Sequence, residues 1–119
     1  MADVLIVDDD VEICLMLADL VGNIGHKTVF CHTLAEGLSH AMSLNFDVIF
    51  LDVKMPDGNG LEILPKLRNT HFPPEVIIIT GAGDSNGAEM AIKNGAWDYL
   101  QKPLYPKNII LPLKRVLQY

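Results

Sequence analysis

Residues 48–52, with the sequence Val-Ile-Phe-Leu-Asp, form the segment that most constrains the fold of this chain. Four consecutive apolar residues, two of them β-branched, are typical of a strand that is buried on both faces. Pro56, Gly58 and Gly60 follow within eight residues, so the chain has to leave the strand and turn. Asp52 therefore stands at the carboxyl end of a buried strand, where open α/β sheets bind ligands. The alternative at this point is that Asp52 only caps the turn.

Short apolar segments alternate with amphipathic ones along the whole chain. We predict strands at residues 4–7, 27–31, 48–52, 76–79 and 97–101, the last one at an edge because it is less apolar. Helices are predicted at 11–24, 34–42, 61–69, 86–94 and 106–119, with Asp10 and Thr33 as N-caps and Gly25 and Gly95 at C-terminal ends. Repeated β-α units predict a doubly wound, flavodoxin-like α/β fold, whose five-stranded parallel sheet has the order 2-1-3-4-5.

Helical spacing also predicts which side chains face the sheet. The second helix is expected to bury Leu34, Leu38, Ala41 and Met42, the fourth Ala88, Ala91 and Ile92, and the last Ile109, Leu113, Val116 and Leu117. Pro65 and Pro112 lie inside predicted helices, where each removes one backbone hydrogen bond, so we expect local distortion.

Composition excludes several classes of protein. A chain of 119 residues suits one domain, and its apolar runs are shorter than the roughly 18 residues of a membrane span. No signal peptide is visible, and a net charge of −6 argues against nucleic-acid binding by this domain. Cys14 and Cys31 lack CxxC spacing and are expected to be reduced, as in a cytoplasmic protein. The four histidines share no metal-ligand spacing and are expected at the surface.

Polar residues follow four of the predicted strands, and the topology brings them to one edge of the sheet. They are Asp8 and Asp9, Asp52, Thr80, and Lys102. Neighbouring carboxylates raise one another's pKa unless a cation lies between them, and a few oxygen ligands with room for water suit Mg²⁺. A hydroxyl and an ammonium group could hold an anion attached to Asp52, with Gly81 letting it approach the backbone. These groups together indicate phosphoryl transfer onto Asp52, although Thr80 could simply end a strand and the acids could form a solvated turn.

Taken together, these motifs resemble the receiver domain of two-component response regulators over essentially the whole chain. The resemblance rests on Asp8-Asp9, the segment LDVKMPDGNG at 51–60, the turn at 80–82, Tyr99, and Lys102-Pro103. It implies that Asp52 accepts a phosphoryl group from a histidine kinase.

The resemblance also implies a role for each site residue. Asp9, Asp52 and the backbone carbonyl of Lys54 would ligate Mg²⁺, with Asp8 acting through water. Lys102 and Thr80 would hold the phosphoryl group, helped by the backbone N–H groups of Lys54 and Gly81. Thr80 and Tyr99 would form the switch pair, and the bond before Pro103 would be cis. Lys54 is a departure that places a cation beside the site, but metal binding through its carbonyl should survive.

A narrower resemblance points to the N-terminal receivers of sigma-54-dependent transcription activators. It rests on ITGAGD at 79–84, AIKNGAWDYLQKPL at 91–104 and LPLKRVLQY at 111–119. Such proteins continue into an ATPase domain and a DNA-binding domain, so residues 1–119 are expected to be a receiver cut from a longer chain. We expect the fourth helix, fifth strand and fifth helix to form its output surface. Trp97, Leu104, Ile110 and Leu111 would then contact a second copy or the ATPase domain.

Three other functions compete with this interpretation. A Mg²⁺-dependent aspartate-nucleophile phosphatase would need a second acid two residues after Asp52, where this chain has Lys54. An FMN carrier of the flavodoxin type would need a donor-rich loop after the first strand, where this chain has three acids. A docking module that keeps the fold without phosphorylation is the third. A receiver would not be an enzyme for a separate substrate, because it catalyses only its own phosphorylation and dephosphorylation.

Overall fold

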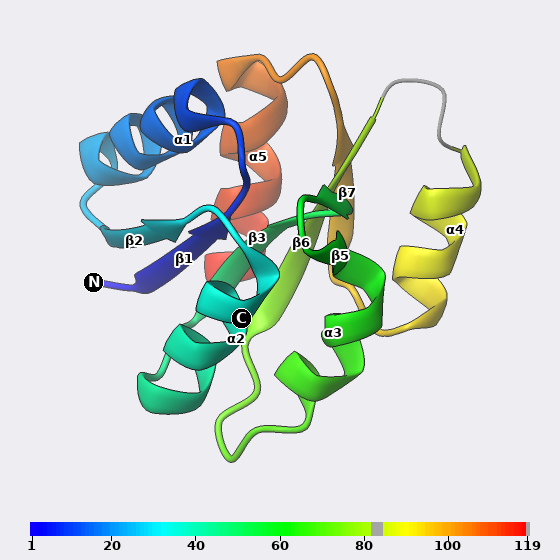
Figure 1. Cartoon of the computed structure of the whole chain (residues 1–119). Coiled ribbons are helices and arrows are strands. Elements are labelled where there is room, and N and C mark those ends of the chain that lie inside the picture. Colours follow the sequence, from blue (N-terminus) through cyan, green and yellow to red (C-terminus); the bar gives the residue numbers. More distant parts are fainter. Residues whose placement is uncertain (82–84, 119) are drawn as a thin grey trace.

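The computed structural model describes residues 1–81 and 85–118 and contains a central parallel sheet. Its five strands are β1 (Asp3–Val7), β2 (Lys27–Cys31), β3 (Val48–Asp52), β6 (Glu75–Thr80) and β7 (Asp98–Gln101). Their order is β2-β1-β3-β6-β7, which confirms the predicted order of the five main strands (Figure 1). A short antiparallel hairpin, β4 (Lys54–Met55) with β5 (Gly58–Asn59), follows β3 and was not predicted.

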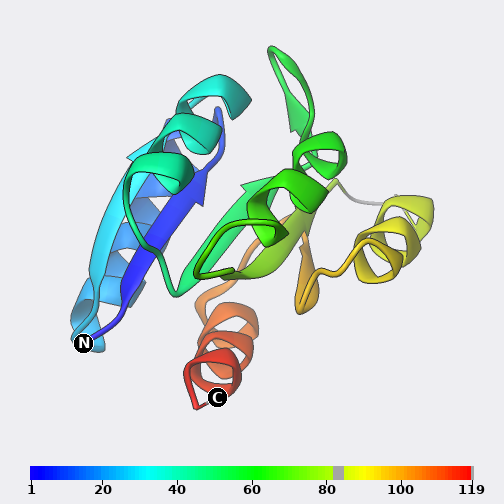
Figure 2. The same ribbon diagram turned by 90° about the horizontal axis from the view of Figure 1, so that it is seen from below.

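Helices cover both faces of the sheet, as a doubly wound fold requires (Figures 1 and 2). Helices α1 (Val11–Asn23) and α5 (Pro106–Leu117) pack on one face, and α2 (Leu34–Ser43), α3 (Gly60–Arg68) and α4 (Ser85–Lys93) pack on the other. All five residues of β3 are buried, so this strand lies at the centre of the core. The expected turn at Ala82 and Gly83 and the expected end of the last helix at Tyr119 lie outside the described residues.

The helices begin and end where the sequence predicts, to within a few residues. Asp10 accepts hydrogen bonds from the N–H groups of Glu12 and Ile13, and the Thr33 hydroxyl accepts one from the N–H of Glu36. Gly25 and Gly95 have φ angles of 93° and 97°, which glycine adopts at low cost after a helix. Helices α3 and α5 continue across Pro65 and Pro112. None of the helices in the described part of the chain is long and apolar enough to span a membrane.

Three predictions of whether an apolar side chain is buried or exposed were wrong. Met42 on α2 and Ile92 on α4 are exposed rather than buried. Each follows a residue that does face the sheet, Ala41 or Ala91, and one step along a helix rotates the side chain by about 100°. Leu104, expected to point outward, instead packs against the core beside α5.

The strand register brings the carboxyl ends of four strands to the same level. Val7 of β1 pairs with Leu51 of β3, and Asp52 pairs with Ile79 of β6. Thr80 in turn pairs with Gln101 of β7. Asp8, Asp9, Asp52, Thr80 and Lys102 therefore lie at, or one or two residues beyond, a strand end along one edge of the sheet, whereas Tyr99 lies within β7.

Candidate functional site

Three carboxylates gather at this edge of the sheet. One oxygen from each of Asp8, Asp9 and Asp52 lies within 4.8 Å of the others. Asp8 and Asp52 are buried, whereas Asp9 is exposed. Clustered acids alone are common on protein surfaces, but two buried carboxylates side by side repel each other in a medium of low dielectric constant.

Lys102 supplies a positive charge to this cluster. Its Nζ lies 3.1 Å from Asp52 Oδ2 and 3.7 Å from Asp8 Oδ2. Burial acts to lower the pKa of Lys102, but attraction to Asp52 and Asp8 outweighs it and the pKa is raised. The ammonium group is therefore charged at neutral pH. The Lys102–Pro103 peptide bond is cis, as expected.

Asp8 has a carboxylate oxygen that fits a metal site. Its Oδ1 accepts a hydrogen bond of 2.9 Å from the N–H of Asp10, whereas its buried Oδ2 has no hydrogen-bond partner among the described residues. Burial, with a further contribution from Asp52, raises the pKa of Asp8 to about 7. An unpartnered buried oxygen next to two other carboxylates is the donor set that a hard divalent cation such as Mg²⁺ would satisfy.

The predicted switch residues lie on the other side of Asp52. Thr80 is fully buried, and its hydroxyl donates to the carbonyl of Leu100 at 3.4 Å. Its own carbonyl accepts from the N–H of Lys102 at 2.9 Å. Tyr99, adjacent to Leu100 on β7, has an exposed side chain, while Gly81 directly after Thr80 is half-buried. The Thr80 hydroxyl is thus bonded to the strand that carries Tyr99.

The loop after Asp52 is held from two sides. The N–H of Gly60 donates to the carbonyl of Val53 at 2.7 Å, and a Cβ atom added to Gly60 would overlap the carbonyl of Asp52. Asp57 accepts hydrogen bonds from Leu34 and Ala35 at the start of α2, at 2.9 and 3.0 Å. These bonds lower the pKa of Asp57. The Lys54 side chain in this loop is exposed.

Two residues beside the site, Asp57 and His32, have no functional role in the sequence-based prediction. Asp57 was taken only as part of a turn, and His32 was expected simply at the surface. His32 is half-buried, and its Nδ1 lies 2.9 Å from the backbone carbonyl oxygen of Asp8. The only sequence signal was position, because each residue lies within a few residues of a strand end in the loops beside the site. Cys14 and Cys31 are free and buried, as predicted.

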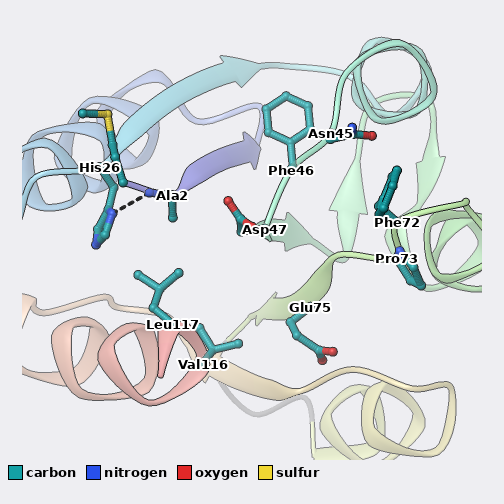
Figure 3. Close-up of a pocket in the computed structure, with 11 residues that line it drawn as sticks. Ala2, His26, Asn45, Phe46, Asp47, Phe72, Pro73, Glu75, Val116 and Leu117 are labelled. Atoms are coloured by element: carbon teal, nitrogen blue, oxygen red, sulfur yellow. Dashed lines mark hydrogen bonds between the residues drawn. The ribbon is translucent and has the colours of Figure 1, made fainter. Parts of the chain in front are cut away.

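A cavity of about 670 Å³ lies at the opposite edge of the sheet (Figure 3). Its walls include Asp47, which precedes β3, Glu75, which begins β6, and Leu117 near the end of α5. Asp52 lies at the far end of β3, roughly 16 Å away at 3.3 Å per residue. This cavity is therefore separate from the acidic cluster. A second cavity of about 560 Å³ between α4 and β7 is lined by Ile92 and Tyr99.

Comparison with known proteins identifies the class to which this fold and site belong. Residues 4–114 match the model of the response regulator receiver domain, and the chain belongs to that family. It is 32% identical over 118 residues to the transcriptional regulatory protein CpxR of Escherichia coli strain K12, and 30% identical over 117 residues to ZraR of the same strain. The chain covers 50% of CpxR and 26% of ZraR, so it spans half or less of the length of these curated relatives.

Solved structures agree with this assignment. A CheY-like receiver domain protein from Methanospirillum hungatei superposes with a TM-score of 0.92 at 27% identity, covering 99% of this chain and 94% of that one. NtrX from Brucella abortus in complex with ADP gives a TM-score of 0.91 at 30% identity, covering 98% of this chain and 27% of NtrX. Receiver domains act in two-component systems with histidine kinases and generally bind Mg²⁺ at an acidic pocket, and an Asp cluster of that kind is present here.

Proposed function

We propose that Asp52 accepts a phosphoryl group from a histidine kinase in the presence of Mg²⁺. The observation that carries this proposal is the contact of Lys102 with Asp52 beside a buried Asp8 oxygen that has no hydrogen-bond partner. Asp52 would serve as nucleophile and Lys102 as the positive charge for the incoming phosphoryl oxygens. Asp9, Asp52 and the Lys54 carbonyl would hold the metal directly, and Asp8 through water.

In this proposal each side chain has a distinct task. A carboxylate oxygen of Asp52 attacks the phosphorus atom while the bond to the kinase histidine breaks. Lys102 offsets the charge on the equatorial oxygens, and the bound ion would supply the remaining neutralisation. The Thr80 hydroxyl, now bonded to the Leu100 carbonyl, would turn towards the phosphoryl group, with the N–H groups of Lys54 and Gly81 as further donors. No separate substrate is turned over.

We further propose that this change reaches an output surface formed by α4, β7 and α5. Tyr99, Trp97 and Leu111 are exposed there, and Tyr99 lies next to the strand carbonyl that holds Thr80. Release of Thr80 would let the Tyr99 ring turn inward, which shifts the population between two packings. The relatives CpxR and ZraR are transcriptional regulators and longer than this chain. We therefore infer a cytoplasmic receiver from a longer transcription regulator of the sigma-54-dependent type, which contacts a second copy or an ATPase domain.

Intact-mass measurement tests the phosphorylation proposal. The protein is incubated with acetyl phosphate and Mg²⁺, and we expect a labile gain of one phosphoryl group. Asp52→Asn should abolish the gain, and EDTA should strongly reduce it. Lys102→Ala should still be phosphorylated but fail to shift the resonances of Thr80 and Tyr99.

The other candidate functions give different results in the same assay. Steady release of phosphate from a small phosphomonoester would instead indicate a phosphatase. A protein that neither binds Mg²⁺ nor gains mass would be a docking module, and the proposal would then be wrong.

A further inference from the structure

The peptide unit between Asp8 and Asp9 joins two of the proposed metal ligands. A peptide unit is planar and rigid, so the direction of its carbonyl fixes the positions of the α-carbons on both sides. The orientation of the Asp8 carbonyl therefore sets where both carboxylates begin. A hydrogen bond that fixes this carbonyl oxygen therefore also fixes the positions of the Asp8 and Asp9 carboxylates relative to Asp52.

This carbonyl lies beyond the sheet ladder. Pairing of β1 with both of its neighbours ends at Val7, opposite Cys31 and Leu51. The N–H of Asp8 still donates to the carbonyl of Cys31 at 3.1 Å, but the Asp8 carbonyl has no strand partner in that register. A buried backbone carbonyl needs a hydrogen-bond donor from elsewhere in the fold.

Two side chains from different elements meet this need. His32 Nδ1, in the loop between β2 and α2, lies 2.9 Å from the Asp8 carbonyl oxygen, and Cys14 Sγ on α1 donates to the same atom at 3.3 Å. A carbonyl can only accept, so the His32 Nδ1 carries the hydrogen. The thiol is a weak donor, which leaves the imidazole as the principal support.

The other polar atoms of Asp8 show what this support achieves. Its N–H is bonded to Cys31, its carbonyl to His32 and Cys14, and its Oδ1 to the N–H of Asp10. Its Oδ2 alone lacks a hydrogen-bond partner within the described part of the chain. The backbone and one carboxylate oxygen are thus fixed, and the other oxygen lies 3.7 Å from Lys102 Nζ, which also contacts Asp52.

We propose that His32 is a positioning residue for the Mg²⁺ site, acting through the Asp8 carbonyl. This inference rests on the proposed function, because it assumes that Asp8 and Asp9 serve a bound cation. Partners that orient metal ligands typically contribute a factor of 10–100 to metal affinity. The group of side chains close enough to share a metal ion, as found among the described residues, consists of Asp8, Asp9 and Asp52 and does not include His32.

Substitutions can separate the donor from the bulk of the ring. The Asn amide nitrogen occupies the place of imidazole Nδ1, whereas the Gln amide nitrogen corresponds to Nε2. His32→Asn therefore keeps a donor facing the Asp8 carbonyl, and His32→Gln moves it away. His26→Ala is the matched control, because His26 is also half-buried and its Nδ1 is also bonded to the backbone, at 2.9 Å from the Ala2 nitrogen at the opposite edge of the sheet (Figure 3).

The measurement is the Mg²⁺ dissociation constant, taken from a titration followed by backbone amide chemical shifts. We expect His32→Gln and His32→Ala to bind Mg²⁺ roughly tenfold more weakly than wild type, and His32→Asn to stay within about threefold. His26→Ala should bind as wild type does. Melting in EDTA is measured for each variant, and the Asn and Gln variants should melt together.

The possible outcomes distinguish the two proposals. If wild type binds Mg²⁺ and His32→Gln binds it equally well, the positioning role is overturned while the metal site stands. If His32→Asn is as weak as His32→Gln, the ring itself rather than its Nδ1 donor matters, and the inference is also overturned. If wild type itself binds no Mg²⁺, the proposed function fails first.

Discussion

At the scale of single residues, Asp8 is a carboxyl group whose pKa is raised mainly because it is buried. Its pKa is about 7 in the folded protein, against a value of 3.8 for an unperturbed Asp. Between these pH values the folded state keeps a proton that the unfolded state has released. The free energy of unfolding should therefore fall as pH rises through this window and level off above about pH 7.

Urea unfolding in EDTA at pH 5, 6, 7 and 8 tests this pH dependence. Wild type should lose stability between pH 5 and pH 7 and change little above that, because ionised Asp8 is repelled by Asp52 and Asp9 and this repulsion is offset in part by Lys102. Asp8→Asn has no such proton and should give a flatter profile. Parallel profiles for the two proteins would show that titration of Asp8 does not cause the pH dependence of stability.

A site residue could be predicted from the sequence when its place depends on a strand end, and could not when it depends on a hydrogen bond to a distant backbone group. Asp8, Asp9, Asp52, Thr80 and Lys102 were found because each follows an apolar strand and the topology brings strand ends together. Whether they perform the roles proposed for them remains a prediction. His32 and Asp57 were missed because their partners are backbone groups of distant segments, and a carbonyl or an N–H leaves no mark in the sequence.

At the scale of elements, the start of α3 is set by its contact with the strand end. Gly60 lies so close to Asp52 that an added Cβ would meet backbone atoms, which cannot move aside as a side chain could. Gly60→Ala should destabilise the protein by at least about 2 kcal/mol. Gly22→Ala on α1 is the comparison, because a Cβ there meets nothing within 4 Å. It should be neutral or stabilise by roughly 0.5 kcal/mol. Chemical denaturation of the two variants measures both effects, and equal stabilities would refute the contact argument.

The elements themselves were largely predictable, since continuous apolar runs, N-cap residues and glycines mark their ends. The β4–β5 hairpin was not, because its strands are too short to show a periodic pattern. Met42 and Ile92 were misplaced for a different reason. Helical spacing leaves the edge of an apolar stripe undefined, and only packing against the sheet decides whether such a residue is covered.

At the scale of the whole molecule, Mg²⁺ should stabilise the fold, because it relieves repulsion among the three carboxylates. At ten times its dissociation constant, the ion should add about 1.4 kcal/mol to the free energy of unfolding. Asp9→Ala should remove this gain. Identical melting curves in EDTA and in saturating Mg²⁺ would contradict the metal site.

The output surface also belongs to this scale. Leu111 on α5 is 52% exposed, next to a half-buried Ile110, and α5 contacts β7, the strand that carries Tyr99. If phosphorylation remodels this face, Leu111→Glu and Ile110→Glu should weaken self-association of the beryllofluoride-treated protein while leaving phosphorylation of Asp52 intact. Leu15→Glu on α1, where the side chain is 55% exposed, should not. Sedimentation measures the association, and a monomer in both states would argue against dimerisation through this face.

The contact of Asp57 with α2 makes two amide hydrogens remote reporters of the site. The N–H groups of Leu34 and Ala35 are bonded to the Asp57 carboxylate, although 23 and 22 residues separate them from it in the chain. Their hydrogens can be replaced by deuterium only when the loop that follows Asp52 releases them. The neighbouring amide of Glu36 is bonded within its own turn to Thr33 and serves as an internal reference. Deuterium uptake at residues 34 and 35 relative to 36 thus records how often the loop that follows Asp52 opens.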